Sequence, residues 1–164
     1  MVPHTSTLRR DDKIDTELAW AAGFFDGEGS TWLSKDTVRY RHPVMAVGQS
    51  GDTEPLERFG RAVGVGKVYG PLAANTQGFL PDGTPRYYLK PRFQWRAAAW
   101  PEVSAALEGL MPYLSSVKVR QALDVLFRYS DSRETQARLR VGKDDRLGSL
   151  IDLAAKRLNA LEEV

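Results

Sequence analysis

The chain has 164 residues, 42% of them hydrophobic and 27% charged, which is enough apolar content for one core and predicts a single domain. It contains no cysteine, which excludes disulfides, a thiol nucleophile and metal sites built from Cys. Its two histidines, His4 and His42, are far apart in the sequence, which argues against a histidine-based catalytic triad or metal site. The net charge is +2, no apolar run reaches membrane-spanning length and no signal-peptide core opens the sequence, so we expect a cytoplasmic protein without a membrane partner.

The N-terminal third is expected to form a helix and two strands. Residues 1–15 are polar and lack periodicity, which predicts a flexible leader, and Thr16 is expected to cap the helix that follows. The segment Ser30–Arg41 alternates in strand fashion with neither face cleanly apolar, which suits a sheet whose outer face meets a ligand. A second strand is expected over Pro43–Gln49.

A second helix and two more strands follow. Thr53–Val63 is predicted to be a helix, with Pro55 in its first turn. Lys67 begins a third strand, and Pro71–Pro85 has the Gly, Pro and Asn content of a long hairpin loop. Arg86–Arg96 is the clearest strand pattern in the sequence.

One face of this last strand carries cations and hydrogen-bonding groups: Arg86, Tyr88, Lys90, Arg92, Gln94 and Arg96. Further cations lie on the other expected strands: Lys35, Arg39, Arg41 and Lys67. Arg and Gln can pair with guanine and adenine edges, and a two-stranded ribbon fits the major groove. A single polar strand is usually a solvated face, but this combined set predicts a sheet that binds DNA.

The last third is expected to be helical. The predicted helices cover Trp100–Met111, the stretch from Ser115 or Ser116 to about Tyr129, Ser132–Arg140 and Arg146–Leu161. We therefore expect a leader at residues 1–15, a main domain at 16–130 and a helical extension of that domain at 131–164.

The segment Leu18–Ser30 combines small residues with two acids. Ala19, Ala22, Gly23 and Asp26 are spaced i, i+3, i+4 and i+7, so they share one face of a helix that another helix can approach closely. The run Asp26-Gly27-Glu28-Gly29 then places two carboxylates between glycines where the helical pattern ends. A carboxylate there is well placed to bind a divalent cation, although D-G-E-G alone is more often a solvated turn.

As one block, A-A-G-F-F-D-G-E-G resembles the LAGLIDADG motif of homing endonucleases. The resemblance implies an α+β fold of order αββαββα, in which helices back a four-stranded antiparallel saddle, here with extra C-terminal helices. It makes Glu28 the metal-binding acid, the carbonyl of Gly27 a second ligand and Asp26 a structural residue. Oxygen ligands favour Mg²⁺, and Mn²⁺ is expected to substitute for it. Family members more often carry Asp at the position of Glu28.

Two further segments extend the resemblance, so that it runs from about residue 18 to residue 126. Met45–Gln49 is similar to the end of the family's second strand, where a glutamine lies near the metal-bound water. Pro112–Ala122 is similar to the stretch that bears the family's active-site lysine, which falls on Lys118. The expected catalytic set is therefore Glu28 as metal ligand, Gln49 orienting water and Lys118 stabilising negative charge.

A single motif supplies one half-site, so the resemblance implies a homodimer, packed through its motif helices, and a roughly palindromic DNA target. The expected function is Mg²⁺-dependent, sequence-specific cleavage of double-stranded DNA without an organic cofactor, in the service of intron or intein mobility. Two alternatives stay open: a non-cleaving nucleic-acid binder such as a maturase or regulator, and an ordinary α+β domain whose acidic turn is accidental. Glu28 favours the enzyme over the binder, and the basic strand argues against the ordinary domain.

Overall fold

The computed structural model describes residues 10–34, 41–72, 81–84, 90–132, 137 and 145–163. Its elements are α1 (Arg10–Glu28), β1 (Gly29–Leu33), β2 (Pro43–Ser50), α2 (Glu54–Val63), β3 (Lys67–Leu72), β4 (Arg92–Ala97), α3 (Trp100–Leu110), the 3₁₀ helix η1 (Met111–Tyr113), α4 (Ser116–Ser130) and α6 (Arg146–Glu162). This order confirms the predicted α+β fold.

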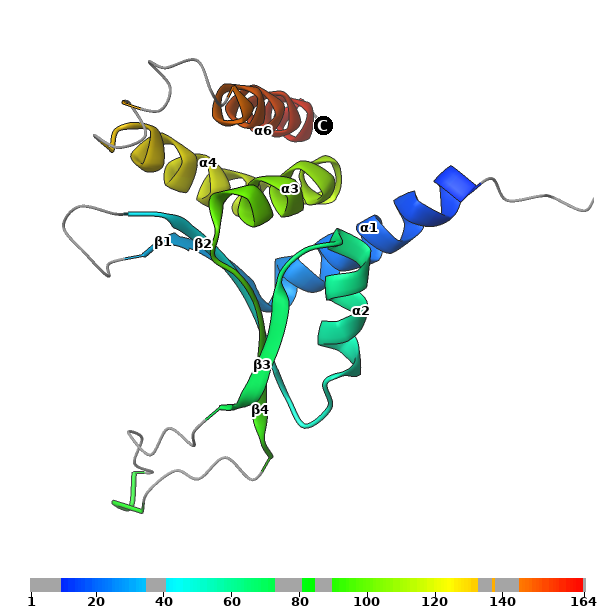
Figure 1. Cartoon of the computed structure of the whole chain (residues 1–164), viewed down its shortest axis with the longest axis vertical. Coiled ribbons are helices and arrows are strands. Elements are labelled where there is room, and N and C mark those ends of the chain that lie inside the picture. The colour runs from blue at the N-terminus through cyan, green and yellow to red at the C-terminus, as the bar shows by residue number, and fades with distance from the viewer. Residues whose placement is uncertain are drawn as a thin grey trace, which may run out of the picture.

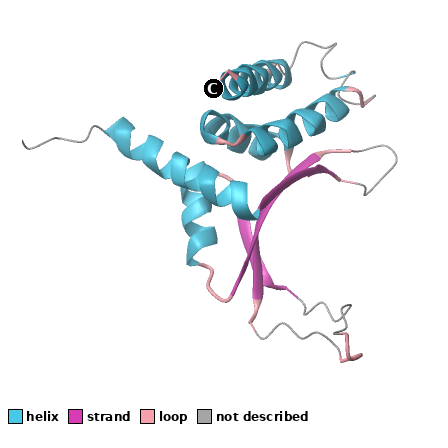
Figure 2. Cartoon of the chain, turned by 180° about the vertical axis from the view of Figure 1, so that it is seen from behind, coloured by secondary structure: helices cyan, strands magenta, loops and turns pink. Residues whose placement is uncertain are grey.

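The four strands form one antiparallel sheet in the order β1-β2-β4-β3. The sheet is curved, and the helices gather on one side of it, with α1 and α2 beside its lower part and α3, α4 and α6 above (Figure 1). No described helix lies across the other side, which we call the open face (Figure 1 and Figure 2). One face of the sheet is therefore available to a ligand.

The core on the helix side is organised around Trp95 of β4, which is fully buried. Its ring meets Phe59 of α2 edge-on at a centroid distance of 4.8 Å, and Phe59 stacks on Phe25 of α1 at 6.2 Å. The indole Nε1–H donates to the carbonyl of Val65 at 3.0 Å, so its polar atom is satisfied. These rings fix the end of α1 against the sheet.

The first helix begins earlier than expected. Because α1 starts at Arg10, Thr16 lies inside the helix and does not cap it, and the helix takes in residues 10–15. Arg58 of α2 donates to both carboxylate oxygens of Glu17 at 2.9 and 3.0 Å, and its guanidinium lies 3.9 Å from the ring centroid of Trp20. These tertiary contacts hold the middle of α1 against α2.

Two strands are shorter in the described residues than expected. β1 ends at Leu33 and β4 begins at Arg92, directly after Pro91, which cannot donate to a ladder. Four predicted DNA-binding residues lie outside the described residues: Lys35, Arg39, Arg86 and Tyr88. Within β1 the alternation is clear, with Thr31 and Leu33 buried.

The C-terminal helices follow the predicted pattern closely, and α6 packs against α4 and α3 (Figure 2). Arg157 of α6 donates to the carbonyl of Leu114 at 3.2 Å, just before α4. Most of the predicted helix at 132–140 lies outside the described residues. In the part of the chain that is described, no helix is both long and apolar enough to cross a membrane.

Candidate active site and nucleic-acid interface

Glu28 and Gly29 form the junction at which α1 ends and β1 begins. A Cβ on Gly29 would lie 2.2 Å from the ring of Phe25, so the core position of that ring excludes any side chain here. Close packing therefore lets the chain pass directly from helix to strand, and Glu28 is left exposed at the turning point.

Glu28 lines a cavity of about 540 Å³ on the open face. The residues around it come from the end of α1 and from three strands: Glu28, Ser30, Trp32, Ala46, Gly48, Gln49, Ser50, Arg92 and Gln94. The fold thus brings Glu28 and Gln49 to one cavity, together with a cation and an amide of β4. The chemical roles of Glu28 and Gln49 stay predictions.

Lys118 lies beside the same junction but not in the cavity. From the first turn of α4 its ammonium donates to the carbonyl of Gly29 and lies 5.7 Å from the ring centroid of Phe25. Among the described residues that line the cavity with Glu28, Lys118 is absent. Its positive charge is therefore held next to the backbone that follows Glu28.

Asp26 caps α4 from a different helix. Its carboxylate accepts hydrogen bonds from the backbone N–H of Ser115 at 3.1 Å and from the Ser115 hydroxyl at 2.9 Å. Ser115 occupies the N-cap position, as one of the two predicted alternatives had it, but its own side chain does not cap the helix and donates to Asp26 instead. These bonds favour a structural role for Asp26 over direct metal binding.

The exposed face of α1 differs from the predicted one. Ala19 and Gly23 are exposed, but Ala22 is fully buried in the core of its own chain, so the prediction that Ala22 faces a second subunit is wrong. The helical repeat places Ala22 on the same side as Phe25 and leaves Ala19, Gly23 and Gly27 outside. A Cβ added at Gly23 or Gly27 would meet nothing within 4 Å, so packing within the chain explains neither glycine.

Polar side chains of β4 lie on the open face, as the alternation predicted: Arg92 and Gln94 line the cavity there. The strand register sets Lys67 of β3 opposite Arg96 and Tyr69 opposite Gln94. Like charges directly opposite each other destabilise a strand pair, and a bound anion would relieve this. The Nε of Arg96 is also buried, without a hydrogen-bond partner in the described part of the chain.

Arg41 and Lys90 lie outside the strands: Arg41 is exposed two residues before β2, and Lys90 is exposed two residues before β4. Both therefore lie close to the ends of strands rather than on the open face of the sheet.

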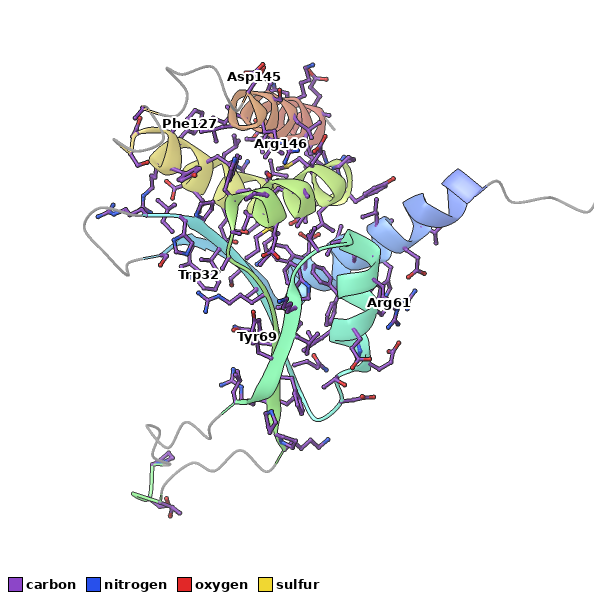
Figure 3. The ribbon with its side chains drawn as sticks, viewed as in Figure 1. Trp32, Arg61, Tyr69, Phe127, Asp145 and Arg146 are labelled. Atoms are coloured by element: carbon purple, nitrogen blue, oxygen red, sulfur yellow. The ribbon has the colours of Figure 1, made fainter. Side chains whose placement is uncertain are left out.

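Sequence reasoning missed two aromatic residues of the open face. Figure 3 shows Trp32 and Tyr69 on the side of the sheet away from the helices, where they are 38% and 50% exposed. The signal was present in the sequence, because Trp32 alternates with Thr31 and Leu33, and Tyr69 shares the strand parity of Lys67.

The donors at the cavity are oxygen atoms suited to Mg²⁺. Glu28 offers a carboxylate and Gln49 an amide oxygen. Gly27 is not among the residues that line the cavity, but its carbonyl lies next to Glu28 in the last turn of α1, where carbonyls lack an intrahelical partner. No three Asp, Glu or His side chains gather into a metal cluster within the described ranges. Mg²⁺ commonly takes one or two carboxylates and completes its shell with water and substrate phosphate, so the donor set fits this ion.

Comparison with known proteins bears on the fold. No protein-family model and no curated protein matches the sequence. The homing endonuclease I-CvuI, solved on the I-CreI target with 2 mM Mg and uncleaved DNA, is 18% identical with a TM-score of 0.52, over 93% of this chain and 98% of that chain. I-CvuI solved on its own target with 2 mM Ca is 17% identical with a TM-score of 0.51, again over 93% of this chain and 98% of that chain. The chain therefore has the fold of the LAGLIDADG homing endonucleases, as its motif led us to expect.

Proposed function

We propose that this chain is a sequence-specific DNA endonuclease that acts inside the cell as a homodimer and cuts both strands of a pseudo-palindromic duplex with Mg²⁺. One observation carries the proposal: Glu28 and Gln49 line a single cavity on the open face, with Arg92 and Gln94 on its wall. An acid, an amide and a cation thus converge where a duplex would lie. The fold shared with a homing endonuclease solved on DNA supports this assignment.

Binding of DNA would use the charge of the open face. Arg92, Arg96 and Lys67 present cations that can neutralise phosphates, and Gln94 can pair with an adenine edge. The opposed Lys67 and Arg96 gain most from an anion, because each otherwise repels the other. We therefore expect affinity to fall steeply as salt rises.

Cleavage would depend on residues around the α1–β1 junction. Glu28 and the Gly27 carbonyl would hold Mg²⁺, which when bound supplies Lewis acidity toward water and the scissile phosphate. The Gln49 amide would orient the water, and the ammonium of Lys118, held at the Gly29 carbonyl, would add positive potential next to the developing charge.

The homodimer is supported by the exposed face of α1. Gly23 lies in the interior of α1, where glycine costs about 1 kcal/mol relative to Ala. Gly27 lies in the last turn, and no contact within the chain requires either glycine. Together with Ala19 they make a surface on which a second α1 can approach closely. Two copies packed there would set two cavities side by side, one for each DNA strand.

A non-cleaving DNA-binding protein on the same fold is the second candidate. The observation that favours it is the position of Lys118, whose ammonium donates to a backbone carbonyl and does not line the cavity of Glu28. Glu28 itself is present and exposed, which favours the nuclease.

The two candidates separate in one experiment on the purified protein. Duplexes bound in Ca²⁺ are selected from a randomised library, and the enriched duplex is then incubated with Mg²⁺ or Mn²⁺. The wild type and the control Glu163→Gln, an exposed acid after α6, should bind and cut. Glu28→Gln should bind and fail to cut. Cutting by Glu28→Gln would refute the assignment of Glu28 as the metal ligand. If the wild type binds the duplex but does not cut it, the second candidate, a non-cleaving DNA-binding protein, is the correct one.

A further inference from the structure

Trp32 is an apolar side chain among the polar groups of the open face. It is 38% exposed, and it lines both the cavity of Glu28 and a second cavity of about 640 Å³ that it shares with Arg96. Figure 3 shows it on the side of the sheet away from the helices. A large aromatic group is thus presented where the proposed function places DNA.

Two apolar residues of β2 lie on the same face of the sheet as Trp32. Val44 lies directly opposite Trp32 in the strand register, and Ala46, two residues further on, shares the same face. They are 0% and 4% exposed, and neither belongs to the core cluster on the helix side. We call Trp32, Val44 and Ala46 the tryptophan patch. Trp32 is the accessible part of this apolar cluster, and Val44 and Ala46 are its buried part.

The major groove offers one apolar group to such a surface. Every base pair presents donors and acceptors there, but only thymine carries a C5-methyl group. Arg92, Gln94 and Arg96 can satisfy donors and acceptors, whereas the tryptophan patch can satisfy neither with its carbon atoms. The chemistry of the patch therefore matches a methyl group better than any other feature of a base edge.

We infer that the tryptophan patch is a specificity subsite that reads the methyl group of one thymine in each half-site. This inference rests on the proposed function, because it requires the open face to dock into the major groove. Contact with the indole ring removes the methyl group from water, and the energy gained is that of burying one carbon. Trp32 thereby sets the base preference at one position without a hydrogen bond.

Replacement of thymine by deoxyuridine tests this directly, because it removes only the methyl group. Each thymine of the duplex selected in Ca²⁺ is replaced singly, and the dissociation constant is measured for the full-length protein. For the wild type, one thymine per half-site should be sensitive, with a loss of about fourfold in affinity, the value for one buried methylene-sized group. For the Trp32→Ala variant, the dissociation constant of the deoxyuridine duplex divided by that of the thymine duplex should fall to one at that position.

Two further variants keep the test interpretable. Trp32→Phe retains an apolar ring over Val44 and should keep most of the discrimination, even if Trp32→Ala folds poorly. Tyr69→Ala removes a different exposed aromatic group of the open face and should leave the ratio at the sensitive thymine unchanged. Because each ratio compares two duplexes on one protein sample, the fraction of folded protein cancels.

The outcomes are distinct. If the wild type binds a specific duplex and no thymine is sensitive to loss of its methyl group, the inference is wrong and the proposed function stands. If Trp32→Ala keeps the wild-type ratio, another residue reads the methyl group. If the wild type enriches no duplex at all, the proposed function fails and the subsite fails with it.

Discussion

Asp26 and Ser115 join the end of the motif helix α1 to the start of α4 across 89 residues of sequence, through hydrogen bonds of 2.9 and 3.1 Å. A further bond, from Lys118 to the Gly29 carbonyl, crosses between the same two segments. The residues on either side of Glu28 are therefore both tied to the first turn of α4. The position of Glu28 is thus fixed by tertiary contacts that its own loop does not supply.

Loss of the Asp26 carboxylate should destabilise the protein. Asp26→Ala leaves the backbone N–H and hydroxyl of Ser115 without their acceptor, and loss of such a cap costs about 1–3 kcal/mol. Urea denaturation at fixed protein concentration should show this loss, with a smaller one for Asp26→Asn, which keeps one oxygen acceptor. Equal stability of Asp26→Ala and the wild type would show that the link contributes nothing.

The two glycines that flank Glu28 should respond differently to alanine. A Cβ at Gly29 would lie 2.2 Å from the Phe25 ring, so Gly29→Ala should cost about 1–3 kcal/mol through overpacking. Within one chain a Cβ at Gly27 meets nothing within 4 Å, so Gly27→Ala should be close to neutral in the monomer. Thermal denaturation of the pair is the measurement. A Gly29→Ala variant as stable as Gly27→Ala would contradict the packing argument.

The sequence predicted much of the fold because its strongest signals are local. The helices α2, α3 and α6 lie within one residue of their expected bounds, and β1 and β4 keep the expected alternation over a shorter range. The early start of α1 was missed because residues 10–15 are polar and show no apolar periodicity. The burial of Ala22 was missed for a related reason: spacing shows which residues share a face, but not which face meets the core.

The sequence allowed us to predict which residues belong to the candidate site, but not how they are arranged in space. Residue patterns and the family resemblance pointed to Glu28 and Gln49, and the fold brings them to one cavity. The cap that Asp26 provides for α4 and the bond of Lys118 to Gly29 join segments that no periodic pattern connects. Trp32 was overlooked because a tryptophan in a strand is usually part of a core.

Lys118 should matter for cleavage more than for binding. Lys118→Ala removes the cation held at the Gly29 carbonyl, and we expect cleavage in Mg²⁺ to slow by about 100-fold, the typical effect of losing one charge-stabilising group. Affinity in Ca²⁺ should change little. The matched control is Arg120→Ala on the same helix, whose exposed cation pairs with Glu162. If both variants slow cleavage equally, the effect of Lys118 reflects the net positive charge of the helix and not its specific position.

A bulky residue on the exposed face of α1 should prevent dimer formation. Gly23→Leu fills the surface that we propose a second α1 approaches, so light scattering coupled to size exclusion should shift from dimer to monomer. Gly148→Leu, at another exposed helical glycine on α6, serves as the control and should leave the mass unchanged. A wild type that is monomeric both free and on DNA would refute the homodimer.

The central claim, that two copies of this chain cut a pseudo-palindromic duplex with Mg²⁺, is tested most directly by cleavage of a randomised duplex library. The library is incubated with the wild-type protein in Mg²⁺, in Ca²⁺ and without metal, and the cut ends are sequenced. We predict cutting in Mg²⁺ alone, at one pseudo-palindromic sequence, with short 3′ overhangs on both strands. Enrichment of a bound duplex that stays intact in all three conditions would contradict the claim.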